Sequence, residues 1–193
     1  MNDITDLQDL NQWVCWDTRA GRKTPISPNG GMASSTDDKT WGSYEEAVEA
    51  TNVNGYDGIG FCFKKGDGLA GIDIDGCLNE NEVPNSFAAS ILNQVETYCE
   101  ISPSGKGLKL LGLCDKDYRG KNTGEIEVYT HSRFFTVTGN CITHTDLGDI
   151  SNIVEQYCTS LATEKVEANL DWDDNDVSDS TLMRSASYLE KMP

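Results

Sequence analysis

Two aspartates interrupt an otherwise apolar, strand-forming run in the sequence GLAGIDIDGC, residues 68–77. Successive side chains of a β-strand point to opposite faces, so Asp73 and Asp75 share one face. Their Cα atoms are separated by about 6.6 Å along a strand, and their carboxylates repel each other unless a cation lies between them. A divalent metal would explain the pair. The simpler alternative is a turn at Gly76 with solvated carboxylates, and it is the more common explanation of an isolated D-x-D.

Two later stretches favour the metal. In EISPSGKGLKLLG, residues 100–112, small residues, hydroxyls and cations occur together in Ser102, Ser104, Gly105, Lys106, Gly107 and Lys109. Glycine-rich backbone, hydroxyls and ammonium groups can all donate to phosphate. The Walker pattern fails at Gly107, and a plain turn between two strands is the alternative. In GEIEVYTHSRFFTVTG, residues 124–139, Glu127 is a third acid between apolar neighbours, with Glu125 on the same face.

The order of predicted elements is mixed α and β. Apolar and β-branched residues predict strands at 12–17, 57–63, 69–75, 107–113, 125–129 and 133–139. We expect the second and third to form a hairpin around the turn KKGDG. Helical spacing predicts helices from the Ser43–Glu46 capping box through residue 50, over 84–98, and over 150–161. Residues 18–41 are predicted to be a long loop.

In this order and spacing, GIGF, GIDID, EISPSGKGLK, GEIEVY and RFFTVTG resemble the primase-polymerase domain of phage and plasmid replication proteins, in the archaeo-eukaryotic primase superfamily. The resemblance also includes GRKTPISPNGGMASSTDDKTW and covers roughly residues 10–160. It implies an α+β fold with an RRM-like antiparallel-sheet catalytic core beside a smaller N-terminal αβ unit. It further implies a DNA primase and DNA polymerase, a metal-dependent nucleotidyltransferase that synthesises or extends primers on a DNA template.

The resemblance also assigns roles to residues. Asp73, Asp75 and Glu127 match the catalytic acids, which would hold Mg²⁺ or Mn²⁺. Ser104, Gly105, Lys106 and Lys109 fall in the motif that binds the triphosphate of the incoming nucleotide. Lys109 stands where that motif commonly has histidine, and a lysine can neutralise phosphate but cannot act as a neutral imidazole.

Several other residues are candidates of lower rank. Lys23 and Arg133 could bind nucleotide, although a solvated surface cation is the more common role. His131 and His144 do not form a ligand pair. The tryptophans could stack on bases, but core packing is the better expectation for Trp13, Trp16 and Trp41.

The formal charge of −17 argues against passive DNA binding. Residues 164–193 hold eight acidic and three basic residues, so that segment carries −5 and residues 1–163 carry −12. Backbone binding usually needs a positive face, whereas an acidic cleft that recruits metal remains compatible. The seven cysteines are scattered and do not form C-x-x-C. The sequence also contains no apolar span of about 20 residues and no signal-like N-terminus. These features predict a cytoplasmic protein, in a bacterial host or encoded by a phage.

We expect three segments: the primase-polymerase domain over 1–163, an acidic linker over 164–180, and the truncated start of a following helical segment over 181–193. The expected partners are single-stranded DNA template, nucleoside triphosphates and a replicative helicase domain in the same full-length chain, with no membrane. The main alternative is a non-catalytic nucleotide- or DNA-binding relative of the same fold. A metal nuclease of the toprim type is disfavoured because its glutamate precedes the D-x-D, and nothing besides D-x-D suggests a sugar-nucleotide transferase.

Overall fold

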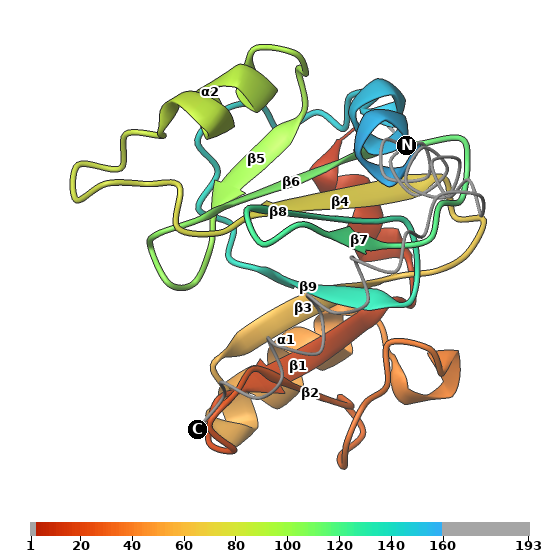
Figure 1. Ribbon diagram of the computed structural model, residues 1–193. Coiled ribbons are helices and arrows are strands. Elements are labelled where there is room, and N and C mark those ends of the chain that lie inside the picture. Colours follow the sequence, from red (N-terminus) through yellow and green to blue (C-terminus); the bar gives the residue numbers. More distant parts are fainter. Residues whose placement is uncertain (1–2, 160–193) are drawn as a thin grey trace, which may run out of the picture. The chain divides into compact units, whose positions relative to one another are not determined.

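The computed structural model describes residues 3–159, of which all but the last belong to one compact unit. Its strands form two antiparallel sheets (Figure 1). The four-stranded sheet has the order β2-β1-β3-β9, with β1 at Trp13–Asp17, β2 at Thr24–Ile26, β3 at Gly58–Phe63 and β9 at Arg133–Val137. The five-stranded sheet has the order β5-β6-β4-β8-β7, with β4 at Leu69–Ile74, β5 at Tyr98–Ile101, β6 at Leu108–Leu113, β7 at Lys121–Asn122 and β8 at Ile126–Tyr129.

The helices are short and lie outside the sheets. Two 3-10 helices are η1 at Ile4–Asp9 and η2 at Asp38–Thr40, and two α-helices are α1 at Tyr44–Asn54 and α2 at Ser86–Leu92. A last helix covers 151–159. The predicted capping box begins α1, because the Ser43 hydroxyl accepts from the Glu46 amide and the Glu46 carboxylate accepts from the Ser43 amide.

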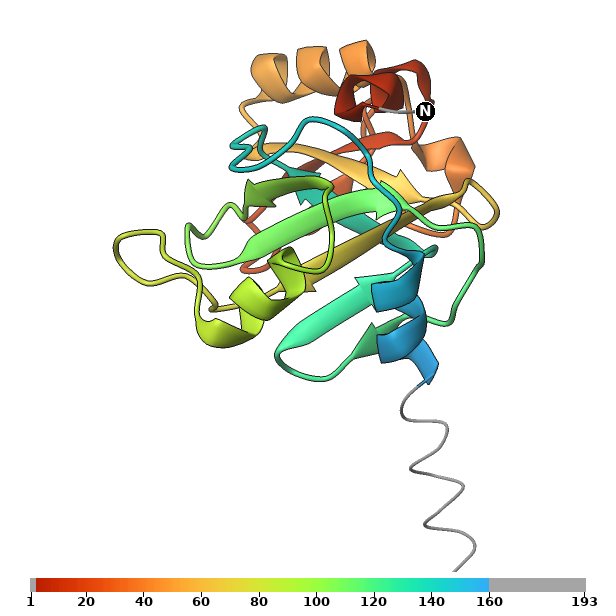
Figure 2. The ribbon, with the colours of Figure 1, turned by 90° about the horizontal axis from the view of Figure 1, so that it is seen from above.

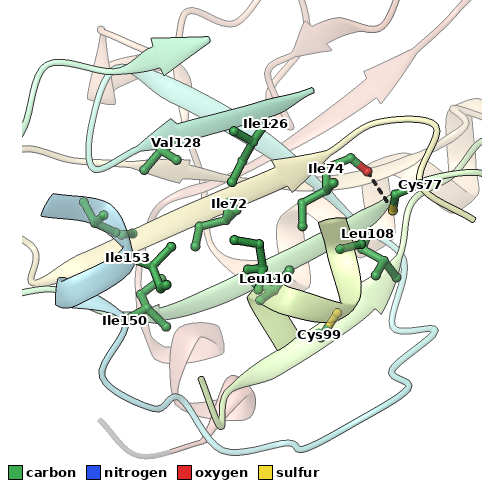
Figure 3. Close-up of a cluster of buried hydrophobic side chains, with 14 of the residues drawn as sticks. Ile72, Ile74, Cys77, Cys99, Leu108, Leu110, Ile126, Val128, Ile150 and Ile153 are labelled. Carbon is green, nitrogen blue, oxygen red and sulfur yellow. Dashed lines mark hydrogen bonds between the residues drawn. The ribbon is translucent and has the colours of Figure 1, made fainter. Parts of the chain in front are cut away.

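One face of the five-stranded sheet is apolar across its four longer strands, β5, β6, β4 and β8. Alternate residues of its central strands, such as Ile72 and Leu110, pack against α2 and the helix 151–159 (Figure 3). Seen from above, both helices lie beside this sheet and α1 lies beside the four-stranded sheet (Figure 2). A second core joins the two sheets and contains Phe61, Phe63 and Phe135 together with Leu111. The five-stranded sheet is therefore covered on both sides.

The mixed α+β fold with antiparallel sheets is confirmed, as are the strand at 12–17 and the capped helix after Ser43. The predicted hairpin is wrong: β3 pairs with β1 and β9, whereas β4 pairs with β6 and β8 in the other sheet. The turn KKGDG crosses between sheets: Phe63 of β3 and Leu69 of β4 share the core between the two sheets, whereas Ile72 of β4 lies in the core on the other face of the five-stranded sheet. The four-stranded sheet, which contains the N-terminal strands β1 and β2, also contains β9 from late in the chain.

Two further expectations need correction. The helix predicted over 84–98 ends at Leu92, and Tyr98 begins β5, because Tyr98 pairs with Leu111 of β6. The loop over 18–41 contains β2 and η2 rather than only irregular backbone. The predicted linker and terminal segment, with the boundary at 163, lie outside the described residues, as does Leu161 of the last helix.

Candidate active site

A row of polar residues crosses the whole five-stranded sheet. The cross-strand pairs are Glu100 with Lys109, Lys109 with Asp73, Asp73 with Glu127, and Glu127 with Asn122. Directly opposed residues of antiparallel strands lie on the same face, so these five side chains share one face. The adjacent rows on the strands point into the apolar core, for example Ile72 opposite Leu110. The row thus brings Asp73, Lys109 and Glu127 together at the centre of the sheet.

Asp73 is the least satisfied member of the row. Its side chain is 15% exposed, and its Oδ2 accepts a hydrogen bond from Lys109 Nζ. Its Oδ1 is buried and has no hydrogen-bond partner among the described residues. Burial raises the pKa of Asp73, Lys109 opposes this rise, and the carboxylates of Asp75 and Glu127 reinforce it. A buried carboxylate oxygen without a donor is an electrostatically favourable place for a cation.

Asp75 lies one residue beyond the end of β4 and is exposed. The loop after Ile101 packs against this point. A Cβ on Gly107 would lie 2.8 Å from the carbonyl oxygen of Ile74 and 3.4 Å from Cα of Asp75, so only glycine allows the loop to approach this closely. The loop predicted to bind phosphate therefore borders the end of β4, where Asp75 follows the strand that carries Asp73.

That loop is closed by its own hydrogen bonds. The Ser102 hydroxyl contacts the Ser104 hydroxyl at 3.0 Å and accepts from the Gly107 amide at 3.2 Å. The Gly105 amide donates to the carbonyl of Ser102, and the Lys106 amide donates to the Ser104 hydroxyl. Gly105 has φ +70°, which favours glycine. Because these amides are already used, Ser104 and Lys106 offer phosphate mainly their exposed side chains.

Glu127 is held by three neighbours. Its Oε2 accepts from Arg133 Nη2 and from the Tyr129 hydroxyl, each at 3.0 Å, and its Oε1 accepts from Asn122 Nδ2. The Arg133 guanidinium lies 4.8 Å from the centre of the Tyr129 ring. Arg133, a predicted nucleotide ligand, therefore forms an ion pair with Glu127, a predicted metal ligand. The half-exposed side chain of Arg133 extends this edge of the site.

Lys23 lies near the same carboxylates although it comes from the loop before β2. Desolvation of its ammonium group lowers its pKa, Lys109 lowers it further, and Asp73 and Asp75 raise it. Lys23 and Ser104 also line a pocket of about 960 Å³. Other walls of this pocket include the aromatic residues Trp16 and Tyr44. Asp73, Asp75 and Glu127 do not line it, whereas Lys23 both lines the pocket and interacts electrostatically with Asp73 and Asp75.

The donor chemistry of this region fits a hard divalent cation. Mg²⁺ and Mn²⁺ prefer carboxylate oxygens and usually need only one or two of them. Asp73 and Asp75 provide two, and the partnerless Oδ1 of Asp73 is available for coordination. Within residues 3–159, however, no three His, Cys, Asp or Glu side chains converge closely enough to hold an ion. The residues therefore fit a metal held mainly by the two aspartates, with Glu127 turned toward Arg133.

Sequence reasoning missed two members of the polar row. Glu100 and Asn122 stand in plain strand positions, and only the pairing register shows that they extend the row. The expectation that the tryptophans pack in the core is confirmed, because Trp13, Trp16 and Trp41 are all buried. His131 and His144 lie outside the row.

The chain is similar to a known phage protein. No protein-family model matches the chain. Over 172 aligned residues it is 34% identical to the DNA primase-polymerase of Nitratiruptor phage NrS-1. The alignment covers 85% of this chain and 24% of that protein, so the chain spans about a quarter of the relative's length.

Proposed function

This chain is a relative of the phage DNA primase-polymerases and carries a domain of that kind, and from this premise we propose that it transfers nucleotides to a primer or starts one on a single-stranded DNA template. The single observation that carries the proposal is the placement of Asp73 opposite both Glu127 and Lys109, with an unsatisfied carboxylate oxygen at the centre of the sheet. A structural carboxylate would have its oxygens paired.

In this proposal Asp73 and Asp75 hold Mg²⁺ or Mn²⁺. The chemistry that a bound divalent cation supplies is Lewis-acid activation of the attacking 3′-hydroxyl and neutralisation of charge on the triphosphate. Lys23 and Ser104, which stand at the border of the pocket, orient the triphosphate. The 3′-hydroxyl loses its proton to solvent water and its oxygen bonds to the α-phosphorus. The bond between the α-phosphorus and the bridging oxygen of the β-phosphate breaks, and pyrophosphate leaves with that electron pair.

Further site residues have supporting roles. Glu127 fixes Arg133, whose guanidinium can reach phosphate beyond the edge of the row. Gly105 allows the tight turn that presents Ser104, and Lys106 is an exposed cation on the same loop. The pocket has the size of ordinary ligand sites, and we assign it to the base and sugar of the incoming nucleotide.

We also propose partners and context. Because the relative is about four times longer, this chain corresponds to one part of a larger replication protein that would carry a replicative helicase domain. The helices within residues 3–159 are too short or too polar to cross a bilayer. We assign the protein to the cytoplasm of a bacterial host cell.

The test is synthesis on a single-stranded template with labelled ribo- or deoxynucleotides, Mg²⁺ or Mn²⁺, with and without a primer. We expect wild-type product and none from the double variant Asp73→Asn, Asp75→Asn. The matched control is Glu80→Gln, Glu82→Gln, which removes two exposed acids with the same spacing. Unchanged synthesis by the aspartate variant would overturn the proposal.

A second candidate function has one observation in its favour. Lys109 already neutralises Asp73, and a site that needs no metal could persist in a non-catalytic nucleotide- or DNA-binding domain. Nucleotide binding without synthesis under either metal, by wild type and variant alike, would favour this candidate. Metal-dependent loss of the template would indicate a nuclease instead.

A further inference from the structure

Lys109 has an unusual position for a lysine. Its side chain is only 5% exposed, its Nζ contacts Asp73 Oδ2, and its ammonium lies 4.3 Å from the centre of the Phe135 ring. Lysine is almost never buried unless its charge is paired. Phe135 comes from the four-stranded sheet, so the ammonium is enclosed between the two sheets and contacts the carboxylate on one side and an aromatic face on another.

The other cross-strand neighbour of Lys109 is already satisfied. Glu100 accepts from the Tyr98 hydroxyl at 2.7 Å, from the Thr138 amide at 3.0 Å and from the Gly139 amide at 2.9 Å. Glu100 therefore has other donors for its charge, and Asp73 is the carboxylate that the Lys109 ammonium contacts. The buried pair leaves Asp73 Oδ1 as the oxygen without a donor.

We propose that Lys109 is a positioning residue, an internal counter-cation that neutralises Asp73 before a divalent metal binds and thereby lowers the affinity of the site for that metal. This inference rests on the proposed function, because it takes Asp73 as a metal ligand. It changes the role expected from the sequence, in which Lys109 binds the triphosphate directly. The groups better exposed for that contact are Lys23, Lys106 and Ser104.

The proposal has two linked consequences. Removing one charge of a buried pair leaves the other uncompensated, so loss of Lys109 destabilises the metal-free protein. The same loss removes a positive charge beside the metal position, so divalent metal binds more tightly. A direct phosphate ligand would have neither consequence, because its removal would weaken nucleotide binding and leave metal affinity unchanged.

The first measurement is thermal melting of the full chain without metal. We expect Lys109→Met and Asp73→Asn each to lower the melting temperature, and the double variant to be more stable than either single variant because no unpaired charge remains. The matched control is Lys65→Met, which removes an exposed lysine in the turn between β3 and β4 and should leave the melting temperature unchanged. Losses that simply add in the double variant would overturn the proposal.

The second measurement is titration of wild type and variants with Mn²⁺ at pH 8. We expect the dissociation constant to fall about fivefold or more in Lys109→Met, and to stay within about twofold of wild type in Lys65→Met. Unchanged or weaker Mn²⁺ binding by Lys109→Met would overturn the inference. So would weaker nucleoside triphosphate binding at saturating metal without any change in Mn²⁺ affinity, since that pattern defines a phosphate ligand.

Two variants distinguish the metal site from the role of Lys109. If Asp73→Asn leaves Mn²⁺ binding unchanged, the metal site of the proposed function is wrong, and this inference is overturned with it. If Asp73→Asn abolishes Mn²⁺ binding while Lys109→Met leaves it unchanged, the metal site stands and only the role of Lys109 is overturned.

Discussion

At the residue scale, Glu100 and Asp73 belong to the same polar row but differ in how their carboxylate oxygens are hydrogen-bonded. Glu100 is fully buried, and both of its oxygens accept hydrogen bonds. Asp73 has one paired oxygen and one without a partner among the described residues. Buried polar groups are normally satisfied, and exceptions need an explanation. Glu100 therefore joins β5 to the segment after β9, whereas Asp73 keeps one oxygen for the metal ion that we propose.

The role of Glu100 gives a prediction at this scale. Tyr98→Phe removes the buried hydroxyl that donates to Glu100 Oε2 at 2.7 Å. Because hydrogen bonds to charged groups contribute more than neutral ones, we expect the free energy of unfolding to fall by about 1.5–3 kcal/mol. Urea denaturation of the metal-free protein measures this change.

The control is Tyr56→Phe, whose ring is half-buried near Arg19. Its effect should stay within about 0.5 kcal/mol, the usual range away from special contacts. Equal stability of Tyr98→Phe and wild type would show that Glu100 does not depend on this donor.

At the scale of elements, the close contact between the two sheets depends on Gly71 of β4. A Cβ at this position would lie 2.5 Å from the ring of Phe135 and 2.6 Å from the ring of Phe63. Both rings belong to the four-stranded sheet. The glycine two residues before Asp73 therefore sets how closely β9, with Phe135 over Lys109, approaches the polar row.

Gly71→Ala is expected to overpack this contact and destabilise the protein by about 1–3 kcal/mol. A rescue variant distinguishes overpacking from a general effect on the strand. Adding Phe63→Leu makes room for the new methyl group, so the double variant should lose less stability than the sum of the two single losses. Differential scanning calorimetry of the three variants measures the coupling, and strict additivity would contradict the close-contact explanation.

At the scale of the whole molecule, charge separates the proposed domain from the segment that follows it. We propose that residues 1–163 are sufficient for folding and nucleotide transfer, since residues 3–158 belong to one compact unit with its own cores. The net charge would change from −17 to −12 on removal of residues 164–193. Both values are unfavourable for binding to the phosphate backbone.

A chain ending at residue 163 should therefore melt at the same temperature as the full chain and synthesise primers at a similar rate. At low salt it should bind single-stranded DNA somewhat more tightly, because less negative charge repels the template. The gain should disappear near 1 M salt, where the screening length is about 3 Å. A truncated chain that fails to fold would place the domain boundary after residue 163.

The sequence alone predicts features that depend on interactions between residues close together in the chain. Strand alternation predicts β4 and the Ser43–Glu46 pair predicts the start of α1, because both signals act within a few residues. The strand ends at Ile74, one residue earlier than predicted, so the shared face of Asp73 and Asp75 stays a prediction. Helical periodicity over 84–98 was less reliable, since cross-strand pairing of Tyr98 prevailed over local spacing. The resemblance of ordered motifs named the correct family of relatives.

Only the tertiary structure decided which strands are neighbours, and the candidate site depends on that choice. The sequence could not show that β3 and β4 enter different sheets, since a turn and two apolar strands fit a hairpin equally well. Nor could it show that Lys109 and Glu127 flank Asp73, because register between distant strands is set by packing of both sheet faces. Burial also makes Lys109 the partner of Asp73, since a buried ammonium is almost always paired with an opposite charge. We propose that this pairing takes the place of the phosphate contact expected from the sequence.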